Sequence, residues 1–334
     1  MTRRRISRRA AGGAALIALG VAIMIALAAV WTFEGPGPEA REGAVTSVIL
    51  AKGSGVRQIG AALDKAGVIT SPTLFSLAAR VTGAGANLKA GEYEIASGAS
   101  MAQVLADIRA GKVVRHLISI PEGWTSGMAL DAVNAAPWLT GVAAEPAEGA
   151  LLPDTYESQR GDDRTVVLQK MADARDKMLA ELWATRAPDL PFATPQEAVT
   201  LASIVEKETG VAAERPRVAA VFINRLKAGM ALQSDPTIIY GLTRGRPLGR
   251  GIRQSELDAI VPYNTYKIVG LPPTPIANPG RAALAAVLHP IQTDELYFVA
   301  DGTGGHVFAS TLAAHEENVK KWREIDRAKA GAVK

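Results

Sequence analysis

An uncharged segment near the N-terminus sets the strongest limit on how this chain folds. Residues 10–33 contain no charged side chain, and apolar residues such as Leu16, Ile23 and Leu27 fill the middle of the segment. At about 1.5 Å per residue, a helix of this length crosses the roughly 30 Å hydrocarbon core of a bilayer. We therefore expect a transmembrane anchor over residues 10–33.

Basic residues before this segment predict its orientation. Arginines stand at positions 3, 4, 5, 8 and 9, with no acidic residue among them. By the positive-inside rule, residues 1–9 form a cytoplasmic tail, and the rest of the chain faces the periplasmic or extracytoplasmic side of the inner (cytoplasmic) membrane. The alternative is a cleaved signal peptide, because Ala26-Leu27-Ala28 has the form of a cleavage site. The apolar segment exceeds a usual signal-peptide core and continues past that site, which favours the retained anchor.

Composition restricts the function of the part after the anchor. The whole chain has 37 Lys and Arg against 33 Asp and Glu, for a formal net charge of +4. The N-terminal arginines account for this excess, so the exported part is near neutral and has no electrostatic footprint for nucleic acid. The chain has no cysteine, which excludes disulfides and thiolate metal sites. Its length is enough for two domains with buried cores.

The exported sequence divides into a linker and two α+β parts. Residues 34–44 are rich in Pro, Gly and charge, as in a short linker. Residues 45–118 form a small α+β subdomain, and residues 119–330 form a larger α+β domain. In the small subdomain the patterns predict strands over 45–50 and 91–95 and helices near 56–67, 74–81 and 101–110.

A well-delimited helix lies in the middle of the larger domain. Thr194 is a good N-cap, Pro195 suits the first helical position, and Glu197 completes a capping box three residues after Thr194. Gly210 supplies the stop. We therefore expect a helix from about Pro195 to the residues before Gly210.

Two carboxylates, Glu206 and Glu208, flank the apolar stripe of this helix. At about 100° per residue, Glu206 lies roughly 90° from the centre of the stripe and Glu208 roughly 70° away on the other side. The two side chains therefore face apart, and this helix alone cannot supply the facing carboxylate pair of an ordinary glycosidase. A carboxyl at the border of an apolar face is partly desolvated, which raises its pKa toward that of a general acid. The alternative is that both are solvated surface charges.

Short motifs in a fixed order carry a family resemblance. The run Ile204-Val-Glu-Lys-Glu-Thr209 is one of them. The others are Glu148-Gly149, Pro153-Asp-Thr-Tyr156, Glu214-Arg215, Val221-Phe-Ile-Asn-Arg-Leu226, Met230-Ala-Leu-Gln-Ser-Asp-Pro-Thr237, Tyr263-Asn-Thr-Tyr266, Gly270-Leu-Pro-Pro273, Tyr297-Phe-Val-Ala-Asp-Gly302 and Gly304-Gly-His-Val-Phe308. With these motifs the chain resembles the endolytic murein transglycosylase (MltG/YceG-like) family over roughly residues 45–320.

The resemblance implies a fold, an activity and a catalytic acid. It implies a LysM-like subdomain over residues 45–118 and a YceG-like catalytic domain over residues 119–330. It implies an endolytic lytic transglycosylase that cleaves MurNAc–GlcNAc β-1,4 bonds within peptidoglycan strands and leaves 1,6-anhydro-MurNAc ends, without a metal or organic cofactor. The family places the acid at the first Glu of the run, which is Glu206 here. A role in ending nascent strands near a peptidoglycan synthase is a family-level expectation, and the LysM-like subdomain either binds glycan or only supports the fold.

Candidate substrate contacts come from polar and aromatic residues after the central helix. Asn224 lies off the apolar stripe of the next helix, facing either a groove or water. Gln233 and Asp235 are expected on a loop or short strand, where site residues are common. Amide, hydroxyl and aromatic groups of the Tyr-Asn-Thr-Tyr motif suit N-acetyl sugars. The expected contacts are Asn224, Gln233, Asp235, Tyr263, Asn264 and Tyr266.

Two other functions remain open at this point. The protein is a non-catalytic peptidoglycan-binding scaffold if Glu206 is inert. It is a hydrolytic muramidase if Asp235, Glu148 or Asp154 positions a water molecule. The four histidines show no His-Glu-x-x-His spacing, which disfavours a metal-dependent hydrolase.

Overall fold

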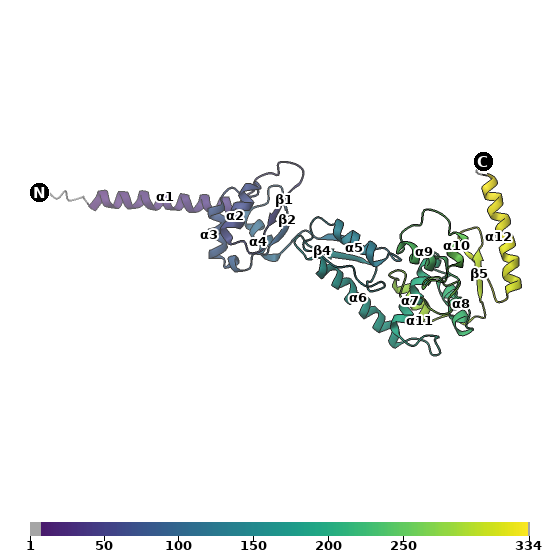
Figure 1. Cartoon of the computed structure of the whole chain (residues 1–334). Helices are drawn as coiled ribbons and strands as arrows, with labels where there is room; N and C mark the ends of the chain where they lie inside the picture. The colour runs from purple at the N-terminus through teal and green to yellow at the C-terminus, as the bar shows by residue number, and fades with distance from the viewer. Residues whose placement is uncertain (1–7, 333–334) are drawn as a thin grey trace. The chain divides into compact units, whose positions relative to one another are not determined.

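The structure, a computed structural model, describes residues 8–332, which separate into two compact units (Figure 1). Unit 1 runs to His116 and includes Gln159–Gly161, whereas unit 2 consists of Leu117–Ser158 and the chain from Asp162 onward. The first arginines of the expected cytoplasmic tail, at positions 3, 4 and 5, lie outside the described residues.

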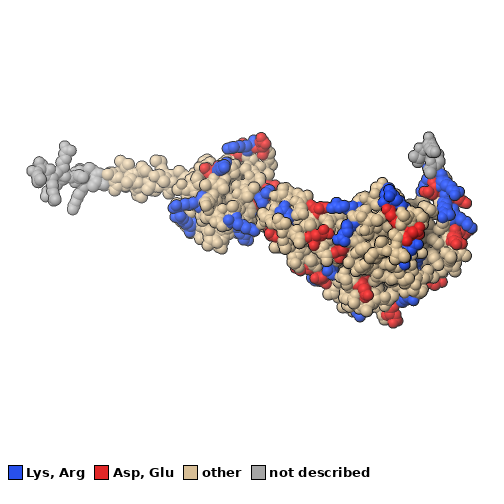
Figure 2. Space-filling model, viewed as in Figure 1, with Lys and Arg blue, Asp and Glu red and all other residues tan. Residues whose placement is uncertain are grey.

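The N-terminal apolar segment forms one long helix, α1 (Arg8–Glu34). Its part Gly13–Glu34 is long and apolar enough to cross a membrane, and the most apolar window of that part is 0% buried by protein. Leu16 and Ile25, for example, are 71% and 65% exposed. Figure 2 shows the exposed length of this helix without charged side chains. A helix with bare apolar sides on all faces suits lipid rather than water, and both membrane anchors and signal sequences have this property.

Unit 1 contains the strands and helices that the sequence predicts for residues 45–110. Strands β1 (Val45–Leu50) and β2 (Gly91–Ala96) pair antiparallel, with Val48 opposite Tyr93. Val48 and Tyr93 are buried in a core that the helices close. These helices are α2 (Val56–Lys65), α3 (Pro72–Val81), the short 3₁₀ helix η1 (Ala84–Ala86) and α4 (Met101–Ala110).

Unit 2 is mainly helical, with two small two-stranded sheets. The first sheet pairs β3 (His116–Ser119) with β4 (Thr155–Ser158), and the second pairs β5 (Tyr297–Ala300) antiparallel with β6 (His306–Ala309). The helices are α5 (Ser126–Ala135), α6 (Arg164–Ala184), α7 (Pro195–Glu208), α8 (Arg215–Lys227), α9 (Asp235–Thr243), α10 (Gln254–Asp258), α11 (Arg281–Leu288) and α12 (Leu312–Ala332).

Helix α7 is the central helix that the sequence predicts, and its capping box is present. The Thr194 hydroxyl accepts the Glu197 N–H at 3.3 Å, and the Glu197 carboxylate accepts the Thr194 N–H at 2.9 Å. Every residue from Ala198 to Val205 is buried, because α8, α9 and α11 pack around the helix. The final turn of α7 extends beyond this core, so residues 206–208 are at least partly exposed.

Several helices, including α9 and α11, were not predicted from the sequence. Asp235, expected on a loop or short strand, is instead the first residue of α9. Pro236 suits a helix N-terminus, and the helix is held by burial of Ile238 and Tyr240 rather than by a long amphipathic pattern. Helix α11 was not predicted: after Arg281 its residues are all Ala, Leu or Val, so its sequence shows no alternation of apolar and polar positions at helical spacing.

Candidate active site

The last turn of α7 points three consecutive side chains in three directions. The Glu206 carboxylate accepts the Gly280 N–H at 3.0 Å, and the Lys207 ammonium donates to the Gly123 carbonyl at 3.3 Å. The Glu208 carboxylate accepts the Ser234 hydroxyl at 2.5 Å. The two carboxylates therefore have different surroundings, as their helical spacing predicts.

Glu208 lines a polar cavity of about 330 Å³, which lies at the lower end of the usual size of a ligand site. Glu206 is not among the residues that line it. The lining residues are Glu208, Arg225, Leu232, Gln233, Asp235, Tyr266, Phe298 and His315. Three of the six substrate contacts expected from the sequence thus surround the second Glu of the Glu-Lys-Glu run.

The surroundings of Glu208 favour its protonated form. Burial raises the pKa of Glu208 to about 7, and the nearby Asp235 charge adds to the rise, while the Ser234 hydrogen bond opposes it. The side chain keeps partial exposure at the cavity although protein atoms enclose most of its carboxyl. At neutral pH, Glu208 is therefore divided between acid and carboxylate, which suits a group that must first donate and then accept a proton.

The loop before α9 is held tightly against the chain around residue 265. The Gln233 N–H donates to the Thr265 carbonyl at 2.9 Å, and the Ser234 N–H donates to the Thr265 hydroxyl at 3.0 Å. Gln233 has a φ of 56°, a left-handed conformation that costs energy for a residue with a side chain. The Arg225 guanidinium also donates to the Leu232 carbonyl of this loop at 2.7 Å. These contacts fix the polar side of the cavity.

A second carboxylate, Asp235, lines the same cavity. Its Oδ1 accepts the Tyr266 hydroxyl at 2.7 Å. Burial and this hydrogen bond raise the pKa of Tyr266, so its hydroxyl stays a donor at neutral pH. The partner carboxylate that α7 cannot supply is therefore available from the first residue of α9.

His315 is a cavity residue to which sequence reasoning gave no role. It comes from α12, and its ring stacks on Tyr297 with centroids 5.1 Å apart and 21° between planes. Its Nδ1 is buried and has no hydrogen-bond partner among residues 8–332. Burial, followed by the Arg225 charge, lowers the pKa of His315. The imidazole is therefore neutral at pH 7. Within residues 8–332 no three or more His, Asp or Glu side chains gather in a way that would hold a metal ion.

Glu206 is held by a backbone hydrogen bond and an ion pair. Its side chain is 6% exposed, and its Oε1 lies 3.5 Å from the Arg215 guanidinium, whose side chain is 11% exposed. Gly280, which donates to it, is the N-cap of α11, so the carboxylate lies at the positive end of that helix. Burial nonetheless raises the pKa of Glu206, with the nearby Glu122 charge adding to the rise.

The other expected contacts lie away from the cavity. The Asn224 amide donates to the carbonyls of Thr293 at 2.8 Å and Glu295 at 3.0 Å. Asn264 is 0% exposed, and its amide donates to three backbone carbonyls of the segment 256–259, so it holds a loop. The Tyr263 hydroxyl lies 2.8 Å from that of Thr274.

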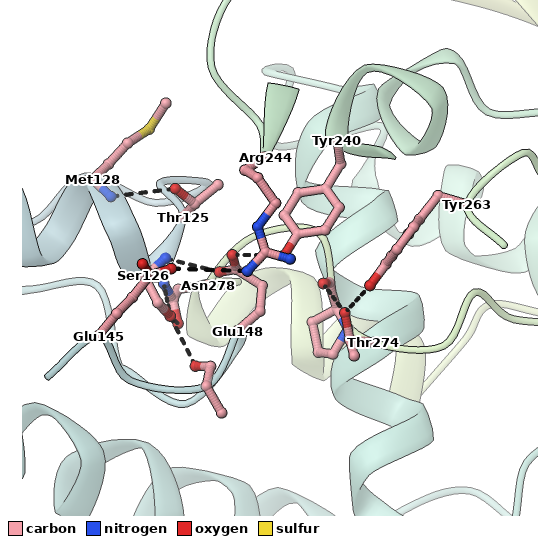
Figure 3. Close-up of polar contacts among 12 residues, drawn as sticks. Thr125, Ser126, Met128, Glu145, Glu148, Tyr240, Arg244, Tyr263, Thr274 and Asn278 are labelled. Carbon is pink, nitrogen blue, oxygen red and sulfur yellow. Dashed lines mark hydrogen bonds and ion pairs between the residues drawn. The ribbon is translucent and has the colours of Figure 1, made fainter. Parts of the chain in front are cut away.

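Glu148, considered from the sequence as another acid, is half-buried beside α5 and α9 (Figure 3). Its carboxylate accepts the Ser126 N–H at 2.8 Å and the Tyr240 hydroxyl at 3.1 Å. Burial raises the pKa of Glu148. These two donors tie the start of α5 to α9, which is a structural use of the carboxylate. Asp154, the other alternative, accepts the N–H of the next residue, Thr155, at 2.7 Å.

Comparison with known proteins places this architecture in a family. The sequence model of the YceG-like family matches residues 48–321. The chain belongs to the YceG-like family. It is also similar to a crystal structure of a yceG-like protein from Listeria monocytogenes, with a TM-score of 0.52 and 28% identity over 82% of this chain and 98% of that one.

Curated relatives in this family are named endolytic murein transglycosylase. One from Streptococcus pneumoniae is 31% identical over 323 residues, which cover 82% of this chain and 57% of the relative. One from Bacillus subtilis is 37% identical over 179 residues, which cover 53% of this chain and 48% of the relative. This chain thus spans about half the length of the curated relatives that it matches.

Proposed function

We propose that this protein is a membrane-anchored endolytic lytic transglycosylase of peptidoglycan. It cleaves the MurNAc–GlcNAc β-1,4 bond within glycan strands and leaves 1,6-anhydro-MurNAc ends. The observation that carries the proposal is Glu208, an enclosed carboxyl with a raised pKa in a cavity lined by amide, hydroxyl and imidazole groups. The names of the family's curated relatives support the same reaction.

This proposal assigns the acid to Glu208 rather than to Glu206, the residue expected from the family resemblance. A catalytic acid must reach the leaving oxygen of a bound substrate. Glu208 lines a cavity, whereas Glu206 does not line that cavity and is engaged with Gly280 and Arg215. The local geometry of Glu208 therefore fits the task better.

The reaction requires one carboxyl used twice. Protonated Glu208 donates its proton to the leaving glycosidic oxygen, and positive charge develops at C1 of MurNAc. The resulting carboxylate then accepts the proton of the C6 hydroxyl as that oxygen bonds to C1. No water enters the product, and the acid is regenerated. The N-acetyl group of the substrate and dipoles such as the Gln233 amide stabilise the charge at C1.

We propose that this reaction takes place at the membrane. Helix α1 anchors the protein, and the catalytic domain faces the periplasmic or extracytoplasmic side. Unit 1 acts as a LysM-like subdomain that contacts glycan. Cleavage close to the membrane would end the elongation of nascent strands beside a peptidoglycan synthase.

The test compares substitutions at the two residues that flank Lys207 in the sequence, Glu206 and Glu208. Full-length protein in mild detergent, with Glu208→Gln and Glu206→Gln beside it, is incubated with purified peptidoglycan, and soluble products are identified by mass spectrometry. We expect anhydro-MurNAc ends from the wild type, none from Glu208→Gln, and some from folded Glu206→Gln. An active Glu208→Gln protein together with an inactive, folded Glu206→Gln protein would return the assignment to Glu206.

A hydrolytic muramidase is the second candidate, and Asp235 is the observation that favours it. This carboxylate lines the cavity of Glu208 and is oriented by Tyr266, so it is placed to activate water. The same assay separates the reactions, because hydrolysis yields reducing MurNAc ends and lytic cleavage yields anhydro ends. Folded protein without products would favour a binding scaffold.

A further inference from the structure

A second cavity of about 430 Å³ lies next to the cavity of Glu208 in unit 2. Neighbouring residues in the sequence line different cavities. Glu208 and Asp235 line the first cavity, whereas Lys207 and Pro236 line the second. The end of α7 and the start of α9 therefore separate two adjoining sites. A strand that is cut internally must extend beyond the acid, so the second cavity lies where the continuing substrate can reach it.

The walls of the second cavity are mostly apolar and aromatic. Trp124, Met128, Ile239, Tyr240, Leu248 and Ile276 supply most of this surface. Figure 3 shows Met128 at the N-cap contact of α5 with Thr125, and Tyr240 of α9 beside Glu148. The Arg244 guanidinium lies 5.4 Å from the centre of the Tyr240 ring. Rigid aromatic and aliphatic walls suit methyl groups and the faces of sugars or peptides.

The charged side chains that line this cavity are both cations, Lys207 and Arg246. Among the described residues no carboxylate lies within 4.0 Å of the Lys207 ammonium, which donates a hydrogen bond to the Gly123 carbonyl. Arg246 pairs with Asp131 at 2.6 Å, with both side chains about 60% exposed, so its remaining donors are accessible. The cavity of Glu208, in contrast, is lined by two carboxylates and Arg225. An anionic group would therefore enter the second cavity and avoid the first.

We propose that the second cavity binds the carboxylate-bearing stem peptide of peptidoglycan, with Lys207 and Arg246 as its charge partners. This inference deepens the proposed function and rests on it. The sugars of the glycan are neutral once the lactyl group is joined to a peptide, so the peptide carries the carboxylates, and its alanine methyl groups match the apolar walls. The enzyme thus selects peptide-bearing strands over bare glycan.

The test measures binding separately from cleavage. Full-length Glu208→Gln protein in detergent is titrated with defined glycan oligomers that carry stem peptides and with the same oligomers after amidase removal of the peptides. We expect the peptide-bearing oligomers to bind about tenfold more tightly, because charge-assisted hydrogen bonds add to apolar contact. Adding Lys207→Gln or Arg246→Gln should lower this ratio of affinities about threefold to fivefold, and raising the salt concentration should lower it further.

Matched variants make the result specific. Arg253→Gln removes an exposed arginine from the same loop as Arg246 without touching the cavity, so it should keep the ratio of the parent protein. Lys207→Arg keeps the charge and should retain the preference. Equal affinity for both oligomers, or a ratio unchanged by both Gln substitutions, overturns the inference. A preserved ratio alongside wild-type protein that makes no anhydro ends would refute the proposed reaction while leaving the peptide site in place.

Discussion

Glu208 is expected to destabilise the folded protein at alkaline pH. The ordinary pKa of a glutamate side chain is 4.5, whereas the pKa of Glu208 is about 7 in the folded protein, so the folded state binds the proton more tightly than the unfolded chain does. Stability is therefore lost as pH rises from about 4.5 to about 7, and the loss is complete above that range. At about 1.36 kcal/mol per pKa unit, the loss approaches roughly 3 kcal/mol.

The Glu208→Gln substitution removes this titration while retaining an oxygen that accepts the Ser234 hydroxyl. We expect the free energies of unfolding of the two proteins to be similar near pH 4.5, and the variant to be more stable by up to about 3 kcal/mol at pH 8.5. Urea unfolding of the full-length proteins in detergent at both pH values, followed by tryptophan fluorescence, measures the difference.

A second carboxylate of the same helix provides a control of opposite sign. Hydrogen bonds from Thr194 and Ala193 hold the pKa of Glu197 below its usual value, with the Thr194 side chain contributing most. Its stabilising effect is present above the unfolded pKa and lost as pH falls, so Glu197→Gln should be less stable than the wild type at pH 8.5. A stability difference between Glu208→Gln and wild type that does not change with pH would refute the placement of Glu208 in a desolvated site.

Three further outcomes follow from the same cavity. Ser234→Ala removes a hydrogen bond that lowers the pKa of Glu208, so the alkaline limb of the kcat–pH profile should move up by roughly 0.5–1 unit, and a downward shift would contradict the assigned donor. Tyr266→Phe removes the hydroxyl that donates to Asp235 and should lower kcat/KM by about tenfold with little change in the urea midpoint. A lower urea midpoint with unchanged kcat/KM would instead show that Tyr266 is purely structural. Asn264→Ala leaves three backbone carbonyls without their donor and should cost about 1–3 kcal/mol in urea unfolding, and an unchanged midpoint would show that the loop does not depend on it.

Local sequence signals predicted the elements but not the choice between the two carboxylates. The caps of α7 depend on neighbours in the sequence, so the sequence predicted them correctly. Helical spacing also predicted that Glu206 and Glu208 diverge. Which of them faces a cavity depends on Ser234 and Gly280, which are distant in sequence and carry no periodic signal.

Only some of the candidate substrate contacts line the cavity, because this too depends on residues that are distant in the sequence. Gln233, Asp235 and Tyr266 meet at the cavity because the loop before α9 bonds to Thr265. Asn264 belongs to the same motif as Tyr266, yet its amide is turned inward to the backbone. Residue type alone does not distinguish a polar group that meets a ligand from one that holds a loop.

The position of Glu208 at the end of its helix has a consequence for how its acidity is maintained. Glu208 is the last residue of α7, where the backbone dipoles of the helix sum to a partial negative charge of about half an electron. That field opposes ionisation of the carboxyl, and it arises from the peptide groups rather than from any side chain. Substitutions around the cavity would therefore leave it in place, whereas extending or shortening α7 by one turn would remove it.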